Sequence, residues 1–451
     1  METADKGDGR TMIHLFDDYS QKTRDLQESL IAAGQQAPTI VIEDDGFLPE
    51  HIDSPVKFFT EDTAEIGKPL QFNQIQVPEF WEIRSTGQEG SIWNQNQKMG
   101  TIHFIPDNPY RLVRAVDWYD LNGQLVLTEH YNRFGRRFAQ TTYKDTNIPV
   151  STSYFNQKGV ECLVINHLTG RVNLQHKGQY LFFQTKVEFI IYYLKEAGYQ
   201  LDGLVFNSLS TPFLVSYYLQ EKGRDILFWQ EAITDSVPEN LLTILKGTNR
   251  PVSIYVQDKS AYEALLALLP ESDHPKLHFL GFLYQFKRQN HQRAHALIMT
   301  NSDTIEHLSE LTEQLPNLHF HIAALTEMSP KLMAFDSKAN VHLYPNSSPA
   351  KLEQLFDQCD IYLDINHFNE VLGSLRKAFL NRMFILGFRE TMHTEEFISE
   401  AFIFQSTDYG KMIQAIQAFL DHSLALDEIM YKQAEAAQLA SVADYQKVFD
   451  H

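Results

Sequence analysis

The chain has almost no cysteine: of 451 residues only Cys162 and Cys359 are cysteines, far apart and outside any CxxC spacing. So few thiols, far apart and without paired spacing, disfavour both a disulfide framework and a zinc knuckle. Long apolar runs are also missing, since none approaches the roughly 20 residues that span a bilayer. We therefore expect a protein of a reducing compartment that makes at most peripheral membrane contact.

Basic side chains are scarce as well, with 38 Lys and Arg against 58 Asp and Glu, a formal charge of −20. This excess opposes general binding to nucleic acid, whose phosphates are also negative. Apolar residues, at 43%, are ample for hydrophobic cores, and the length suggests two or three domains. Residues 1–11 carry neither a basic start nor an apolar segment, so we expect a flexible leader and no secretory signal.

Residues 12–48 and 180–285 alternate apolar strands with helical periodicity, which predicts a first Rossmann-like domain. Met12–Phe16 has the pattern of a buried strand, and a helix after Ser20 ends at Gly34. Helical periodicity returns at Tyr180–Gly198. Asp44 and Asp45 offer two carboxylates to a metal, but an acidic pair beside glycine is more typical of a turn.

Residues 49–179 lack helical spacing and predict an extended antiparallel insertion within that domain. Similar turn sequences end at Gly123, Gly135, Gly159 and Gly170, with spacings of 12, 24 and 11 residues. A tight turn about every dozen residues is typical of a meander, with Asx residues and glycine supplying the turn geometry. Such a sheet can leave one face open to solvent.

The meander is locally basic, because residues 111–177 hold nine Lys or Arg against five Asp or Glu. Arginines alternate there with aromatic residues, a pattern that fits a platform for a polymer, a partner protein or an anionic surface. It fits equally well a solvated face with cross-strand aromatic pairs. The residues assigned to a partner or membrane surface are Arg114, Trp118, Arg133, Arg136 and Arg137.

Residues 290–422 alternate strands and helices strictly and predict a second, doubly wound Rossmann-like domain. A basic, polar linker over Tyr284–His295 precedes it, and a C-terminal helix over 423–451 follows it. His291 and His295 have the i, i+4 spacing of a metal pair but no third ligand nearby, so we expect no metal there. Two such domains facing a cleft, with the inserted meander, predict a GT-B-like α/β fold.

Ile361–Phe388 is the clearest βαβ unit, with strands at Ile361–Ile365 and Met383–Phe388 and a helix expected over Glu370–Leu380. Ligands of open parallel sheets bind beyond the carboxyl ends of strands, so the polar elbow before this helix is the candidate site. Its donors and acceptors suit sugar hydroxyls, although helix capping and a strand-end carboxylate explain them without a ligand. The candidate acceptor- or sugar-binding residues are Asp364, Asn366, His367, Asn369 and Glu370.

Three segments carry a resemblance to a known family: MIHLFDDYSQKTRDLQESLIAAG from Met12, DDGFLPE from Asp44 and YLDINHFNEVL from Tyr362. The chain resembles, from Met12 onward, the glycosyltransferase-stabilising proteins of the accessory Sec system. The resemblance implies a GT-B-like fold, no cofactor, and a cytoplasmic 2+2 assembly with a catalytic peptide O-GlcNAc transferase. It also implies a serine-rich-repeat adhesin as substrate and a place at the inner face of the cell membrane.

Retaining GT-B enzymes of the related type carry two glutamates separated by seven residues at this elbow, and here Glu370 is followed eight positions on by Ala378. Such enzymes also hold the donor diphosphate with Arg and Lys, whereas residues 296–330 contain neither. Asp303 and Glu306 stand there instead, and a like-charge pair at 4 Å costs about 1 kcal/mol in water and more in a cleft. We expect a noncatalytic, acceptor-binding subunit; the alternatives are an active transferase with an atypical site and a stand-alone GlcNAc-peptide-binding module.

Overall fold

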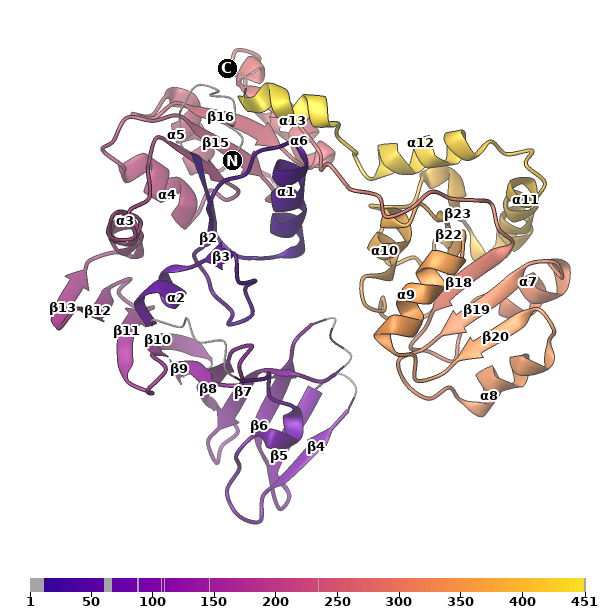
Figure 1. Ribbon diagram of the computed structural model, residues 1–451, viewed down its shortest axis with the longest axis horizontal. Helices are drawn as coiled ribbons and strands as arrows, with labels where there is room; N and C mark the ends of the chain where they lie inside the picture. The colour runs from indigo at the N-terminus through magenta and orange to yellow at the C-terminus, as the bar shows by residue number, and fades with distance from the viewer. Residues whose placement is uncertain are drawn as a thin grey trace, which may run out of the picture. The chain divides into compact units, whose positions relative to one another are not determined.

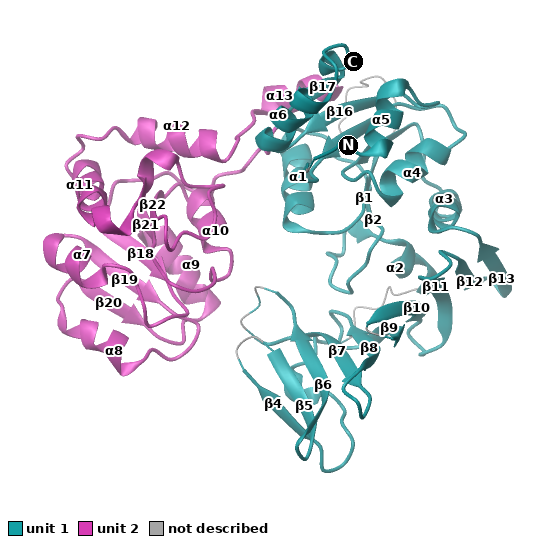
Figure 2. Ribbon diagram, turned by 180° about the vertical axis from the view of Figure 1, so that it is seen from behind, with its two compact units in different colours: residues 1–280 teal, residues 281–451 magenta. Residues whose placement is uncertain are grey.

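The computed structural model describes residues 12–60, 67–86, 89–106, 108, 110–145, 147–233 and 235–449, so the leader expected over residues 1–11 lies outside the described residues. The chain divides into two compact units, Met1–Leu280 and Gly281–His451 (Figure 2). Both cysteines are buried, and no disulfide joins them. None of the helices in the described ranges combines the length and hydrophobicity that a bilayer crossing requires.

The first unit contains a seven-stranded parallel sheet in the order β17-β16-β15-β14-β1-β2-β3. Figure 1 labels β2, β3, β15 and β16 of this sheet. Its strands are buried because helices follow them in βα alternation. The strands are β1 (Met12–Phe16), β2 (Thr39–Val41), β3 (Ile52–Asp53), β14 (Gly203–Phe206), β15 (Asp225–Trp229), β16 (Val252–Val256) and β17 (Leu277–Phe279). The helices are α1 (Gln21–Ala32), α2 (Pro55–Thr60), α3 (Lys186–Glu196), α4 (Thr211–Tyr218), α5 (Glu239–Lys246) and α6 (Lys259–Leu268).

Between β3 and β14 the chain forms a ten-stranded antiparallel meander in which successive strands are neighbours. The four predicted glycine turns are present, with φ of 78°, 75°, 74° and 72° at Gly123, Gly135, Gly159 and Gly170. The strands are β4 (Glu82–Ser85), β5 (Glu89–Asn94), β6 (Gln97–Phe104), β7 (Val113–Tyr119), β8 (Leu125–Tyr131), β9 (Arg137–Lys144), β10 (Ile148–Phe155), β11 (Glu161–Asn166), β12 (Val172–His176) and β13 (Gln179–Phe183).

The helix predicted over Tyr180–Gly198 is wrong at its start, where the structure has the strand β13. Lys177 and Gly178 both have positive φ, 50° and 77°, which is the conformation of a two-residue hairpin turn. This turn folds Gln179–Phe183 back onto β12, so the sheet continues past residue 179. The helix α3 starts only at Lys186, where the Thr185 hydroxyl accepts a hydrogen bond from Glu188 N at 3.1 Å.

The meander is also less open than predicted. Leu163 and Leu174 are buried in the same core as Phe59 of α2 and Phe189 of α3, so helices cover that end of the sheet. On the strands nearer β4, Ile92, Ile102 and Val116 form a second small core against residues 70–83. Over the middle strands, the face that carries Leu163 is lined mainly by polar side chains.

The second unit holds a six-stranded parallel sheet in the order β20-β19-β18-β21-β22-β23, which is the 3-2-1-4-5-6 order of a Rossmann fold. The single C-terminal helix expected over 423–451 is two helices, α12 (Leu426–Ala436) and α13 (Val442–Phe449). The strands are β18 (His295–Met299), β19 (His319–Ala323), β20 (Val341–Tyr344), β21 (Ile361–Asp364), β22 (Phe384–Phe388) and β23 (Ile403–Phe404). The helices are α7 (Leu308–Gln314), α8 (Pro330–Met333), α9 (Pro349–Gln358), α10 (Ser374–Leu380), α11 (Tyr409–Leu420), α12 (Leu426–Ala436) and α13 (Val442–Phe449).

Candidate functional site

The predicted elbow lies at the switch point of the second sheet, where β18 and β21 are neighbours and the strand order reverses. The helix after it is shorter than predicted, because α10 begins at Ser374 and not at Glu370. Phe368, Leu372 and Gly373 have positive φ, 140°, 56° and 59°, so the chain turns too sharply there for a helix. Glu370 caps the helix instead, since its carboxylate accepts a hydrogen bond from Leu375 N at 2.8 Å.

Asp364 at the end of β21 is buried and holds His393. Its carboxylate accepts hydrogen bonds from His393 N at 2.9 Å and from the ring Nδ1 at 2.6 Å. The other ring nitrogen lies 2.6 Å from the Phe368 carbonyl oxygen. The hydrogen bond to Asp364 raises the pKa of His393 above its usual value. Asp364 therefore fastens the loop after β22 to the elbow.

The next elbow side chains also bond within the second unit. Asn366 accepts a hydrogen bond from the Thr300 hydroxyl at 2.6 Å, which ties the ends of β21 and β18 together. His367 lies 2.5 Å from the Glu306 carboxylate, which also accepts from the Ser406 hydroxyl. For Asn369 the structure gives a contact through its carbonyl, 3.5 Å from the Asn366 amide. Most of the five predicted residues thus shape the elbow, and their contact with a sugar stays a prediction.

The five residues predicted as a partner or membrane surface lie in different surroundings. Trp118 Nε1 and Arg137 both donate to Glu129, at 3.0 and 2.8 Å. Arg133 pairs with Glu50 at 3.1 Å. The guanidinium carbon of Arg136 lies 5.7 Å from the ring centre of Phe134, and burial lowers the pKa of that arginine. Arg114 lines a pocket. The predicted surface is therefore partly neutralised by carboxylates of the first unit.

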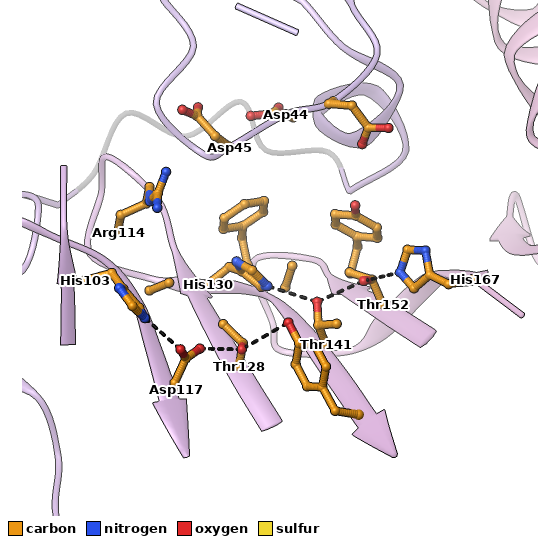
Figure 3. A pocket seen from close by; sticks show the side chains of 16 residues that line it. Asp44, Asp45, His103, Arg114, Asp117, Thr128, His130, Thr141, Thr152 and His167 are labelled. Carbon is orange, nitrogen blue, oxygen red and sulfur yellow. Dashed lines mark hydrogen bonds and ion pairs between the residues drawn. The ribbon is translucent and has the colours of Figure 1, made fainter. Parts of the chain in front are cut away.

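That pocket has a volume of about 470 Å³ and lies between the middle of the meander and the loop after β2 (Figure 3). It was not predicted, because its side chains come from five strands and two loops and are not adjacent in sequence. The period-2 pattern of polar residues in β7 to β10 is the signal that marks their common face. The lining residues are Glu43, Asp44, Asp45, His103, Arg114, Ala115, Asp117, Thr128, His130, Phe138, Ala139, Thr141, Tyr143, Thr152, Tyr154 and His167.

Two hydrogen-bonded rows cross the pocket floor (Figure 3). In one, His103 Nε2 lies 2.7 Å from Asp117, whose other oxygen accepts from the Thr128 hydroxyl at 2.5 Å. Thr128 also bonds the Tyr143 hydroxyl at 3.2 Å.

In the second row, His130, Thr141, Thr152 and His167 follow one another with separations of 2.9, 2.9 and 2.8 Å. These rows exist because residues opposite each other on neighbouring antiparallel strands, such as Thr128 and Thr141, share one face.

The pocket floor combines charged side chains with neutral polar ones. Burial lowers the pKa of His130 to about 4, so its imidazole is neutral at pH 7. Burial alone would raise the pKa of Asp117, but hydrogen bonds from His103 and Thr128 outweigh it and the pKa is lowered. Asp117 is therefore ionised. Arg114 is a cation of the pocket lining, and Asp45 stands across the pocket from it (Figure 3).

The two suggested metal pairs have other partners. Asp44 accepts from Gly46 N at 2.8 Å and from the Ser54 hydroxyl at 2.6 Å, and Asp45 accepts from Phe47 N at 2.9 Å. His295 lies 2.8 Å from His321, on β19, whereas His291 lies before β18. Over the described residues, no group of three His, Cys, Asp or Glu side chains is arranged to hold a metal ion.

Two Rossmann-type sheets joined to an antiparallel meander place the chain in the GT-B-like class of α/β proteins. Family descriptions match along its length: GtfB N-terminal domain at residues 13–59, GtfB middle domain at 81–184 and GtfB third domain at 186–268. Residues 296–433 match the GftB/GlyA-F C-terminal domain.

Relatives match over nearly the whole chain. The UDP-N-acetylglucosamine--peptide N-acetylglucosaminyltransferase stabilizing protein GtfB of Streptococcus pneumoniae serotype 4 (strain ATCC BAA-334 / TIGR4) is 42% identical, covering 97% of this chain and 98% of its own. The protein of the same name from Streptococcus gordonii is also 42% identical, over the same shares. A chain in the crystal structure of a GtfA/B complex bound to UDP and GlcNAc superimposes with a TM-score of 0.89 at 41% identity, covering 97% of this chain and 99% of that chain. The chain belongs to this GtfB family of transferase-stabilizing proteins.

Proposed function

We propose that the chain is the noncatalytic, acceptor-binding subunit of a protein O-GlcNAc transferase complex. Relatives named as stabilizing proteins of such a transferase match 97% of the chain, which supports the assignment. Its partner is a catalytic paralogue in a 2+2 heteromer. Its substrate is a serine-rich-repeat adhesin, glycosylated in the cytoplasm at the inner face of the membrane before accessory Sec export.

The proposal that the subunit is noncatalytic rests on the hydrogen bonds of the elbow side chains. Glu306 and His367 bond each other, Asp364 holds His393, and Glu370 caps α10. These hydrogen bonds engage the groups with the protein itself, which supports a structural role for them over binding of an activated sugar. Residues 296–330 also contain no Lys or Arg to balance a diphosphate, while Glu306 adds negative charge.

Co-purification followed by a transfer assay tests the proposal. The chain and the catalytic paralogue are mixed with UDP-GlcNAc and a serine-rich acceptor peptide, each alone and then together. We expect no transfer by this chain alone, and more soluble and more active transferase when both are present. Transfer by the isolated chain that is lost in Glu370→Gln would establish the atypical-enzyme alternative. Binding of GlcNAc-modified peptide without any effect on the paralogue would establish the stand-alone module.

A further inference from the structure

The two edges of the ten-stranded meander carry different side chains. At one edge, β4 presents Glu82 and Arg84, whose side chains are 63% and 52% exposed and carry opposite charges. At the other edge, β13 presents Tyr180 and Phe182, which are 69% and 70% exposed. Charged side chains on an edge strand discourage pairing with a strand of another chain, whereas an apolar edge permits it. The edge at β4 is therefore protected from such pairing, and the edge at β13 is not.

The strand β13 also has backbone groups that point away from its sheet. The two-residue turn before it makes Gln179 the hydrogen-bonded partner of His176. Hydrogen-bonded and non-hydrogen-bonded pairs alternate along an antiparallel ladder, so the N–H and C=O groups of Tyr180 and Phe182 point to the outer edge. Within the described part of the chain, no hydrogen bond reaches these groups. In both views β13 is the outermost strand at its end of the meander (Figure 1, Figure 2).

We propose that β13 pairs with β13 of a second copy of this chain, antiparallel and about a twofold axis at Leu181. Only residues with outward backbone groups can exchange both hydrogen bonds across the new ladder. Of the twofold registers, the one centred on Leu181 uses the outward groups of both residues, because it places Tyr180 opposite Phe182 of the second copy. The axis then repeats the same pair on its other side.

The side chains favour a second copy as the occupant of this edge. Tyr180 and Phe182 lie on one face of β13, so each ring meets the other kind of ring across the new ladder, and such aromatic pairs stabilise antiparallel sheets. Gln179–Phe183 contains no charge, no proline and no bulge that would oppose pairing with an identical strand. Lys177, in the turn beside it, is paired with Glu196. A second copy supplies this match by symmetry.

The contact is small, so we expect a weak dimer. An aromatic side chain buries about 150–250 Å² when fully covered. Each copy brings only Tyr180 and Phe182, which leaves the interface below the roughly 1,200 Å² of stable complexes. Association of the isolated chain should therefore depend on concentration, with a Kd of about 10–100 µM.

The 2+2 heteromer would strengthen this weak contact. It holds two copies of the chain together, which raises their effective concentration and favours the same pairing. This step rests on the proposed function above, whereas the pairing of the isolated chain does not.

Sedimentation velocity of the isolated full-length chain, from about 1 to about 200 µM, tests the pairing. We expect the sedimentation coefficient to rise from that of a monomer towards that of a dimer and no further, because each copy uses its single β13 edge. Phe182→Lys should weaken the dimer at least about 10-fold, since it removes a ring from each aromatic pair and puts a cation there. The matched control is Phe80→Lys, the same change at an 88% exposed phenylalanine of the same unit, which should leave the Kd unchanged.

Cysteine cross-linking tests the register and does not depend on a weakened variant. A hydrogen-bonded antiparallel pair has Cα atoms about 5.5 Å apart, which a disulfide can bridge. We therefore expect a mixture of Tyr180→Cys and Phe182→Cys chains to cross-link under mild oxidation. Either variant alone should cross-link much less, because identical positions are offset along the strand. The wild-type chain is the control for background, since its own cysteines are buried.

A chain that stays monomeric over this concentration range, equal effects of Phe182→Lys and Phe80→Lys, or equal cross-linking in mixed and single variants would overturn the proposal. So would a monomer whose Phe182→Lys variant loses the catalytic paralogue or a serine-rich peptide, because the edge would then belong to that partner. Failure of the proposed function is seen separately, as a lack of any effect on transfer by the catalytic paralogue.

Discussion

Gly46 fixes the loop that forms the upper wall of the pocket. Its φ is +85°, a conformation that L side chains rarely adopt, and its carbonyl accepts a hydrogen bond from Arg133 N at 2.9 Å. A Cβ atom at this position would lie 2.6 Å from Phe138 Cε1 and 2.9 Å from Asn132 Cα. The glycine is required both by the turn after Asp44 and by the close approach of the meander.

We expect Gly46→Ala to be more destabilising than a glycine substitution with the same backbone strain alone. Gly159 is the matched control, since its φ is +74° but a Cβ atom added there would meet no other atom within 4 Å. Gly159→Ala should cost about 1–2 kcal/mol of unfolding free energy from the left-handed conformation. Gly46→Ala should cost about 1–3 kcal/mol more from overpacking. Urea unfolding measures both, and equal losses would show that the loop moves away freely.

At the scale of elements, β18, β19 and β20 place four histidines on one face of the second sheet. His295 lies opposite His319, and His321 lies opposite His342, because these parallel strands pair in that register. His295 and His321 are 2.8 Å apart, and His319 and His342 are 3.0 Å apart, so the rings bond across the strands. Burial, and then repulsion from the neighbouring histidines and Lys351, lowers the pKa of His321 to about 3.

This row predicts that the second unit loses stability in mild acid. The folded state holds His321 neutral down to a pKa of about 3, whereas an unfolded histidine takes a proton near its ordinary pKa of 6.5. The unfolded state therefore binds more protons between these values, and the unfolding free energy falls as pH decreases from 6.5 towards 3. The slope for one such group is at most about 1.4 kcal/mol per pH unit.

Urea unfolding at pH 7, 6 and 5 checks this pH dependence. We expect His321→Gln to reduce the slope of the unfolding free energy against pH by up to about 1.4 kcal/mol per pH unit. His422→Gln serves as control, because it replaces an exposed imidazole in the same unit. A pH dependence that is identical in both variants would mean that the row carries no linkage to folding.

The whole chain has a formal charge of −20, whereas the meander is locally basic, so its charge distinguishes the meander from the rest of the chain. Arg133 and Arg137 are paired with Glu50 and Glu129 but keep 35% and 45% of their side chains exposed, so they can still meet a partner. We expect charge reversal to Glu at Arg133, Arg136 and Arg137 to weaken association with the catalytic paralogue or with anionic vesicles. Exposed charge pairs are each worth about 1 kcal/mol or less, so a three-residue change should reduce binding about 10- to 100-fold.

Pull-down and vesicle flotation measure the two associations. A control with the same change in charge is the reversal of Lys331, Lys411 and Lys447, exposed lysines of the second unit. If the arginine and lysine variants behave alike in both assays, the basic meander is not an interface.

Local patterns along the chain were enough to predict several features. Alternating βα segments predicted the parallel sheets, because period and burial are set by neighbouring residues. The Asx-glycine turns at Gly123, Gly135, Gly159 and Gly170 predicted the meander, since the left-handed conformation needs glycine wherever the turn occurs. By contrast, Tyr180–Phe183 fits either a helix or a strand by its apolar pattern, and pairing with β12 decided for the strand.

Sequence was enough to specify the sheets, the turns and the lack of Lys and Arg in residues 296–330, because each depends on residues close together in the chain. Tertiary structure alone decided what the polar side chains do. His367 bonds Glu306, Asp364 bonds His393, and the pocket is lined by residues as distant in sequence as Asp45 and His167. These partners lie 29 to 122 residues apart. Strand order and register bring them together, and neither is encoded in any single segment.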